Sequence, residues 1–196
     1  RQKQTVIIQE AATAMAQEGG GEDIIFAFSP DFSAGLVGLA ASRLVDAYYR
    51  PAVVGHIEDG HARASCRSIP EFHITQALDE CRELLVRHGG HSVAAGFTVQ
   101  LERLEELKSR LAEIAQRELG GRELVPVLKA DAEIELDTLR PDLFGYLDLL
   151  EPTGQANSVA RFVSRNVRVV RSRTVGAEAQ HLKLTLSGGG IYLDAI

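Results

Sequence analysis

A glycine pair followed by a histidine is the first part of the chain that could bind an anion. In Gly89-Gly90-His91 the two glycines let the backbone approach a ligand closely, because no Cβ intervenes. Amide N–H groups exposed in such a turn suit an anionic oxygen, and the histidine can donate a hydrogen bond to a phosphate or a sugar. A plainer interpretation is that Gly89 ends a helix and His91 begins a strand. The triplet alone does not decide between the two.

A serine–arginine segment is the second candidate. On a strand, Ser65 and Arg67 point to the same face, and Ser68 follows just past the strand's end. Two hydroxyls beside a guanidinium form a small phosphate-binding group, since the planar fork of arginine matches phosphate oxygens. A solvent-exposed strand end is the alternative. We expect this segment and Gly89-Gly90-His91 to converge on one pocket for a nucleotide phosphate.

Arginines elsewhere in the chain extend the set of possible anion contacts. Arg43 lies about two turns into a helix expected to begin near Gly35, and it could face either solvent or a cleft. A stretch without any acid carries five more arginines, namely Arg161, Arg165, Arg168, Arg171 and Arg173. A β-surface lined with arginine can follow a phosphate backbone. Aromatic residues are sparse there, so the pattern favours binding by charge over base stacking.

The sequence also narrows the function by what it does not contain. The net charge of −6 argues against a protein coated uniformly for nucleic acid, so local charge must decide. The six histidines are scattered, and no HExxH, P-loop or GxSxG motif occurs. Asp131, Glu133 and Glu135 alternate, which is more typical of a solvent-exposed strand than of a metal site. A hydrolase needs a group that activates water, and we predict that this chain holds neither a metal nor a catalytic residue.

Nothing in the sequence indicates a membrane or a secretory route. No apolar run reaches the roughly 18 residues of a membrane helix, and no signal-peptide pattern opens the chain. Cys66 and Cys81 form no disulfide framework, so we expect reduced thiols and a cytoplasmic location. The chain begins with Arg1, and residues 193–196 end inside an expected strand. We therefore expect a piece of a longer protein, with a trimmed small protein as the alternative.

The hydrophobic pattern predicts an α/β part followed by a β-rich part. Helices are expected at 3–18, 36–49, 74–88 and 101–119, and strands at 24–28, 52–55, 61–67 and 94–99. Strands that alternate with helices indicate an α/β layer, whose boundary we place near 120–123. Beyond it, strands are expected at 124–128, 132–136, 162–170, 182–186 and 191–196, with a short helix at 143–150. These elements favour a small barrel without its last strands.

Several of these segments resemble, in the right order, the RecJ-type exonucleases of the DHH phosphoesterase family. Gly89-Gly90-His91 followed by Ala94-Ala95-Gly96-Phe97 is similar to the signature of the DHH-associated domain. Ser65-Cys66-Arg67-Ser68 resembles the Ser-x-Arg-Ser segment of the RecJ branch. Further likenesses lie at 35–44, 49–51, 150–157 and 181–184. The chain departs from the family at Phe32-Ser33, where Trp-His is usual, and at Thr153, where phenylalanine is more common.

The resemblance implies a domain organisation. Residues 1–18 would end a helix that connects two domains. Residues 19–121 would be the DHH-associated substrate-binding domain, with a mixed sheet and flanking helices. Residues 122–196 would be an incomplete oligonucleotide-binding (OB) domain. Ser65, Arg67, Ser68, Gly89, Gly90 and His91 would then hold the phosphates or the terminal nucleotide.

The same resemblance implies an activity for the full-length protein. It would be a monomeric enzyme of DNA repair and recombination that hydrolyses single-stranded DNA from 5′ to 3′. Its Mn²⁺ or Mg²⁺ would bind a preceding DHH domain absent here, so this chain would be inactive alone. Its partners would be single-stranded DNA and that catalytic domain. Two alternatives stay open: a freestanding nucleic-acid-binding module, or a fragment of an oligonucleotide or cyclic-dinucleotide phosphodiesterase of the DHH family. The β-rich segment 122–196 argues against the phosphodiesterase.

Overall fold

The computed structural model describes residues 23–154 and 156–196, which fall into two compact units. The boundary between the units lies after Pro126, a few residues beyond the one expected at 120–123. The helix expected at 3–18 lies outside the described residues. Each unit is described by itself below.

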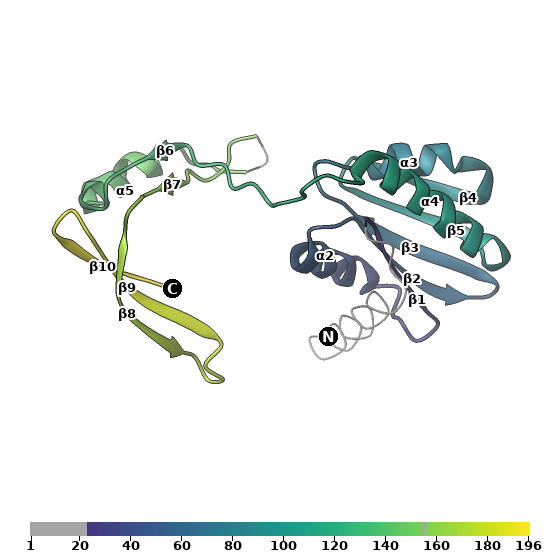
Figure 1. Ribbon diagram of the computed structural model, residues 1–196, viewed down its shortest axis with the longest axis horizontal. Helices are drawn as coiled ribbons and strands as arrows, with labels where there is room; N and C mark the ends of the chain where they lie inside the picture. Colours follow the sequence, from purple (N-terminus) through teal and green to yellow (C-terminus); the bar gives the residue numbers. More distant parts are fainter. Residues whose placement is uncertain (1–22, 155) are drawn as a thin grey trace. The chain divides into compact units, whose positions relative to one another are not determined.

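Unit 1, the part up to Pro126, is built on a five-stranded mixed sheet (Figure 1). Its strands are β1 (Ile25–Ser29), β2 (Ala52–Glu58), β3 (His61–Arg67), β4 (Leu85–His91) and β5 (Ala94–Gln100), in the order β1-β2-β3-β5-β4. β1 and β2 are parallel and are joined through helix α2 (Val37–Tyr48), as a parallel pair requires a crossover. The remaining neighbours are antiparallel.

Helices cover the two faces of this sheet unequally. α3 (Ile74–Glu80) and α4 (Leu104–Leu119) lie on one face, and α2 lies on the other (Figure 1). The α3–α4 face has the larger core, to which β3 contributes Ala62, Ala64 and Cys66. α2 buries its apolar side against β1 and β2, and its Gly38 lies over Ser65 and Arg67 of β3. The strict alternation of β3 therefore leaves Arg63, Ser65 and Arg67 on the α2 side of the sheet.

The helix expected at 74–88 is wrong in its second half. α3 ends at Glu80, the short 3₁₀ turn η1 (Arg82–Leu84) follows, and the chain then enters β4. The apolar residues do continue at helical spacing to Leu85, but pairing with β5 across a tight hairpin stabilises the strand instead. Gly89-Gly90-His91 therefore lies on a strand, and Gly89 does not end a helix. The helix expected at 101–119 is confirmed as the turn η2 (Leu101–Arg103) followed by α4.

Unit 2, Val127–Ile196, is β-rich with one helix among its described residues. Its antiparallel sheet has the order β10-β9-β8, from β8 (Arg168–Val175), β9 (His181–Gly188) and β10 (Ile191–Ala195). β6 (Ala132–Glu133) pairs in parallel with β7 (Phe162–Val163), and the helix is α5 (Pro141–Asp148). No strand forms at 124–128, all of which is described, so that expectation is wrong, and the strand expected at 162–170 divides into β7 and β8. Leu136 of the 3₁₀ turn η3 (Leu136–Thr138) is the buried apolar side chain among the described residues of this unit.

Candidate nucleic-acid interface

On the α2 side of the sheet, α2 contacts β2 and β3, whereas no described helix covers β5 and β4. The strand register places Arg67, Ala94 and His91 in one row across these strands, Ser65, Gly96 and Gly89 in the next, and Arg63, Thr98 and Arg87 in the third. Residues directly opposite each other on neighbouring strands point to the same face, so all nine share one surface, called the open face below. The residues that alternate with them on β3 and β5 are buried against α3 and α4.

The open face brings the two predicted anion-binding segments together. Arg67 and His91 stand in one row with a single strand between them, which puts their Cα atoms about 10 Å apart. A long arginine side chain and an imidazole can reach a common ligand over that distance. Ser65 and Gly89 occupy the neighbouring row in the same way. That these residues bind phosphate stays a prediction.

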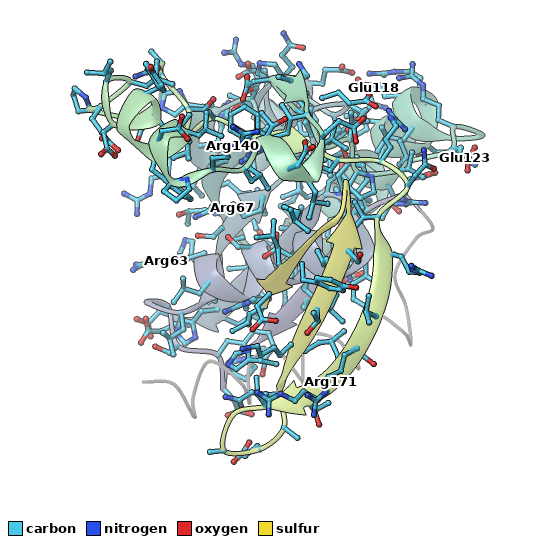
Figure 2. All side chains as sticks on the ribbon, turned by 90° about the vertical axis from the view of Figure 1, so that its left-hand side faces the viewer. Arg63, Arg67, Glu118, Glu123, Arg140 and Arg171 are labelled. Carbon is cyan, nitrogen blue, oxygen red and sulfur yellow. The ribbon has the colours of Figure 1, made fainter. Side chains whose placement is uncertain are left out.

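Arg67 is held at the border between the open face and α2. Its Nη1 donates to the carbonyl of Cys66 at 2.9 Å. A Cβ added to Gly38 of α2 would lie 3.3 Å from Arg67 Nη2 and 3.4 Å from Ser65 Oγ. The glycine thus lets the guanidinium and the hydroxyl lie against the helix. Arg67 is half-buried and extends from the same strand as Arg63, whose side chain is exposed on this face (Figure 2).

A β-bulge adds Arg87 to the open face. Leu85 pairs with Val99 on the buried side, and the register then shifts so that Arg87 pairs with Thr98. Strict alternation would put Arg87 on the same side as Leu85, and the extra residue Val86 reverses that. The Nε of Arg87 donates to Oγ1 of Thr98 at 3.2 Å, which leaves its terminal nitrogens free for another acceptor.

Charge on the open face is of one sign. Its nine positions carry three arginines and one histidine but no acid. Within the described residues, none of Arg63, Arg67 and Arg87 pairs with a carboxylate. Guanidinium groups that lack a counter-ion and lie on a rigid sheet suit an anionic ligand.

The hairpin that carries His91 is fixed by backbone contacts. The hydroxyl of Thr75 donates to the His91 carbonyl at 2.6 Å, and the Ile74 amide donates to the Ser92 carbonyl. Gly90 has a φ of 151°, and a Cβ there would lie 2.4 Å from the Ala94 carbonyl oxygen, so only glycine fits. In contrast, a Cβ on Gly89 would meet nothing within 4 Å. Gly90 therefore shapes the turn, whereas Gly89 leaves space above the sheet.

A hollow of about 360 Å³ occupies part of this space. Its lining consists of Arg63, Ala64, Arg87, His88, Gly89, Gly96, Phe97 and Thr98. Gly89 and Gly96 face each other across the β4–β5 pair and put no side chain into it. The hollow is thus floored by backbone and flanked by two arginines.

Several other histidine, serine and arginine side chains are placed elsewhere. The hydroxyl of Ser68 is buried and donates to the carbonyl of Phe72 at 2.7 Å. It therefore stabilises the loop after β3 and does not lie on the open face. Arg43 is on α2, about 140° round the helix from Gly38, and so points away from Ser65 and Arg67. His88 lies on the other side of β4 and contacts Asp79 of α3 at 2.7 Å.

The position at which the chain departs from the family pattern lies beside α2. Phe32 is buried in the α2 cluster, where its ring adds apolar contact between the β1 end and the helix. Ser33 accepts the amide of Leu36 through its carbonyl at 2.9 Å and so shapes the turn that leads into α2. Phe32-Ser33 therefore has a structural role in this chain.

Unit 2 carries a second arginine-lined sheet surface. Arg168, Arg171 and Arg173 pair with Ser187, Thr185 and Lys183 of β9, so all three arginines share a face, called the arginine face below. A register shift at Val170 is responsible, because Arg168 and Arg171 would point to opposite faces on a regular strand. Tyr192 of β10 is exposed on the same face, opposite Ser187. Figure 2 shows Arg171 near the end of this sheet.

The other two predicted arginines of unit 2 have separate roles. Arg165 Nε donates to the carboxylate of Glu133 at 3.0 Å, so this arginine already has an acidic partner. The backbone amide of Arg161 donates to the carboxylate of Asp131 at 2.7 Å. On the arginine face itself, Lys183 pairs with Asp194 at 2.8 Å. The hydrogen bond from Lys183, together with that from Thr185, lowers the pKa of the Asp194 carboxyl.

The arrangement of the His, Cys, Asp and Glu side chains bears on whether the described residues could hold a metal ion. No three His, Cys, Asp or Glu side chains among them gather so as to hold a metal ion. Burial raises the pKa of the Cys66 thiol to about 12, which keeps it protonated and unreactive. In the described part of the chain, no helix is both long and apolar enough to cross a membrane.

Comparison with known families and proteins matches both units. The DHHA1 domain matches residues 21–117, and the RecJ OB domain matches residues 130–196. The single-stranded-DNA-specific exonuclease RecJ of Bacillus subtilis (strain 168) is 33% identical over 189 residues, which cover 95% of this chain and 24% of that protein. The enzyme of the same name from Dickeya dadantii (strain 3937) is 32% identical over 176 residues, 86% of this chain and 30% of that protein.

A solved structure supports the fold. The crystal structure of RecJ in complex with Mn²⁺ from Thermus thermophilus matches with a TM-score of 0.72 at 24% identity, over 97% of this chain and 28% of that one. The mixed sheet with its helices and the β-rich unit that follows thus define a DHHA1 domain joined to an OB domain. The chain belongs to the RecJ family. It spans less than a third of the length of these relatives, and neither matched domain is the catalytic DHH domain.

Proposed function

We propose that this chain is the substrate-binding part of a RecJ-like exonuclease and that its open face holds single-stranded DNA. The carrying observation is the row of Arg67 and His91, with Ser65 and Gly89 beside it, on a surface without acids. Arg67 would bind a phosphate through its free guanidinium edge, and His91 would donate to the same phosphate or its sugar. Within the described residues the His91 ring has no hydrogen-bond partner that would compete.

The whole protein would hydrolyse phosphodiesters from 5′ to 3′ with a divalent metal held in a DHH domain outside this chain. The metal would supply an activated water and neutralise charge on the phosphate. The described residues would position the strand and leave hydrolysis to that domain. The arginine face of unit 2 would bind the strand through charge, with little dependence on sequence. Such a protein would act in the cytoplasm, in DNA repair and recombination.

Binding by matched variants tests the proposal. A 5′-phosphorylated oligothymidylate is titrated with the chain, and its fluorescence anisotropy is measured. Arg67→Ala should weaken binding about tenfold to a hundredfold, because a charge-assisted hydrogen bond to phosphate is lost. Arg110→Ala removes an exposed charge from α4, on the opposite side of the sheet, and should change binding less than about twofold. Equal effects of the two substitutions would overturn the site.

Two further comparisons separate the alternatives. A cyclic dinucleotide should bind far more weakly than the long single strand if the RecJ interpretation holds, and the reverse order would favour a small phosphodiesterase. When the chain is joined to its upstream catalytic domain, Arg67→Ala and His91→Ala should both slow metal-dependent release of nucleotides from single strands. A joined protein that releases none would favour a freestanding binding module.

A further inference from the structure

We propose that Arg63 and Arg87 bind a second phosphodiester of the strand, distinct from the phosphate at Arg67 and His91. This inference rests on the proposed function, since it assumes that the open face binds a nucleic-acid strand. It assigns a role to two arginines outside the Ser65–Arg67 and Gly89–His91 segments. If the inference holds, a ligand must be longer than one nucleotide to contact both phosphate sites of the open face.

The distance between the two outer rows separates their ligands. Arg63 and Arg67 are four residues apart on β3, as are Arg87 and His91 on β4, which corresponds to about 14 Å along the strands. Hydrogen bonds keep Arg67 and Arg87 within their own rows, because Arg67 is bound to the Cys66 carbonyl and Arg87 to Thr98. One phosphate group is too small to contact both rows. Two phosphates of one strand can contact one row each.

The hollow between the rows gives the strand a path. It contains Arg63 and Arg87 on its flanks and Gly89 and Gly96 at its floor. Gly89 has open space where its Cβ would be, so the sugar–phosphate backbone can approach the main chain there. A nucleotide that leaves the Arg67 row along the sheet therefore passes over this floor toward Arg63 and Arg87.

The charges of the third row also point to an anion. Arg63 and Arg87 stand on either side of one strand, with Thr98 between them. Two guanidinium groups on either side of one strand can both reach an anion that lies over that strand. Among the described residues neither arginine has a carboxylate partner. A phosphodiester in the hollow would supply that negative charge.

Binding of oligonucleotides of increasing length to the whole chain tests this inference. 5′-Phosphorylated oligothymidylates of one to six nucleotides compete with a labelled single strand, and the affinity step on each added nucleotide is recorded. For the native chain we expect a step within the first few nucleotides. The double variant Arg63→Ala with Arg87→Ala should remove that step and lower the affinity for the longer oligomers about tenfold or more. Thymidine 5′-monophosphate should bind it within about twofold of the native chain.

Matched variants keep the outcomes separate. The double variant Arg103→Ala with Arg110→Ala removes the same charge from η2 and α4 and should retain the step. Gly89→Ala places a methyl in open space and should weaken the longer oligomers more than the mononucleotide. A native chain without any step, or an Arg63/Arg87 variant that keeps it, would overturn the inference. An Arg67→Ala variant that binds every length normally would instead overturn the proposed function.

Amide shifts in NMR spectra provide a second measurement for weak ligands. The mononucleotide should shift the amides of His91 and Ala94, and longer oligomers should extend the shifts to Arg87 and Thr98. If the mononucleotide alone already shifts the Arg87 row as strongly as the His91 row, a single phosphate site is sufficient and the second site is rejected.

Discussion

The open face of unit 1 and the arginine face of unit 2 both present several arginines on one side of a sheet, but they differ in how that sheet is supported. Both place three arginines on one side of antiparallel strands, and both need a β-bulge to do so, at Val86 and at Val170. They differ in what lies behind them. The open face is backed by buried residues such as Cys66 and Phe97, whereas Leu182, behind the arginine face, is 53% exposed.

This difference predicts different kinds of binding. A sheet packed against a core holds its side chains at fixed separations, because close-packed interiors allow little displacement. If it binds a strand as proposed, the open face should therefore distinguish ligands by length and by the position of the phosphate. A sheet with little buried behind it offers positive charge without fixed spacing. The arginine face should bind any single strand in proportion to the phosphates it contacts.

The largest expected effect separates two adjacent glycines. Gly90→Ala should lower the free energy of unfolding of unit 1 by about 3 kcal/mol, because its φ is positive and its Cβ would contact the backbone of Ala94. Gly89→Ala should change the same quantity by less than about 1 kcal/mol. Urea denaturation of both variants measures the contrast. Similar losses of stability would mean that the glycine pair acts only as a turn.

The next largest effect is on how steeply the binding of single-stranded DNA depends on salt concentration. The triple variant Arg168→Ala, Arg171→Ala and Arg173→Ala should reduce the log–log slope of binding against salt by about 2, or about 0.7 per lost phosphate contact. Arg67→Ala should reduce the slope by about 0.7 only, although it removes a larger share of affinity per residue. Titrations of a long oligothymidylate at several salt concentrations measure both slopes. A triple variant with the native slope would contradict a binding role for the arginine face.

The sequence predicted the fold where local pattern and tertiary packing agree. The alternation of residues 61–67 and the helical spacing of 101–119 each matched one buried side, and both elements formed as expected. Residues 85–88 continued a helical pattern, yet their hairpin partners on β5 drew them into a strand. Sequence spacing contains no information about that non-local pairing. The same limit explains the strand wrongly expected at 124–128.

The candidate site was predictable only in part, for a related reason. Ser65, Arg67 and His91 could be found from residue type, and Arg63 could have been added because it lies two residues from Ser65 on the same strand. Arg87 could not be found by alternation, because the bulge at Val86 reverses its side. Ser68 looked like a phosphate ligand until the loop brought the Phe72 carbonyl to its hydroxyl.

A smaller effect is expected for Gly38→Ala, which should weaken DNA binding without lowering the stability of unit 1. In Gly38→Ala the new methyl would lie 3.3 Å from Arg67 Nη2, so the end of the arginine side chain must move by a few tenths of an ångström. Because alanine favours a helix, the free energy of unfolding should stay the same or rise by up to about 1 kcal/mol. Binding of a 5′-phosphorylated oligothymidylate should weaken about fivefold. Unchanged binding would show that the position of Arg67 against α2 is unimportant.

The smallest effect is a pH dependence confined to the arginine face. Hydrogen bonds from Lys183 and Thr185 lower the pKa of the Asp194 carboxyl in the folded chain. A carboxyl whose pKa falls on folding stabilises the fold above its unfolded pKa, near 3.9, and this contribution is lost as the pH falls through the lower folded value. Protonation of Asp194 also frees the Lys183 ammonium, so binding of an oligothymidylate by the arginine face should rise slightly once the pH falls through that lowered folded pKa. The open face has no carboxylate and should show no such rise.

An NMR titration of the Asp194 side chain measures the lowered pKa, and Lys183→Met should return it toward the usual range. The reason is that the lysine supplies the largest of the contacts that favour the ionised carboxyl, ahead of Thr185. A pKa that stays low in Lys183→Met would mean that Thr185 and the neighbouring Arg173 hold the carboxylate. In that case the ion pair between Lys183 and Asp194 contributes little. Lys183 would then be available to bind the strand, as a further cation of the arginine face.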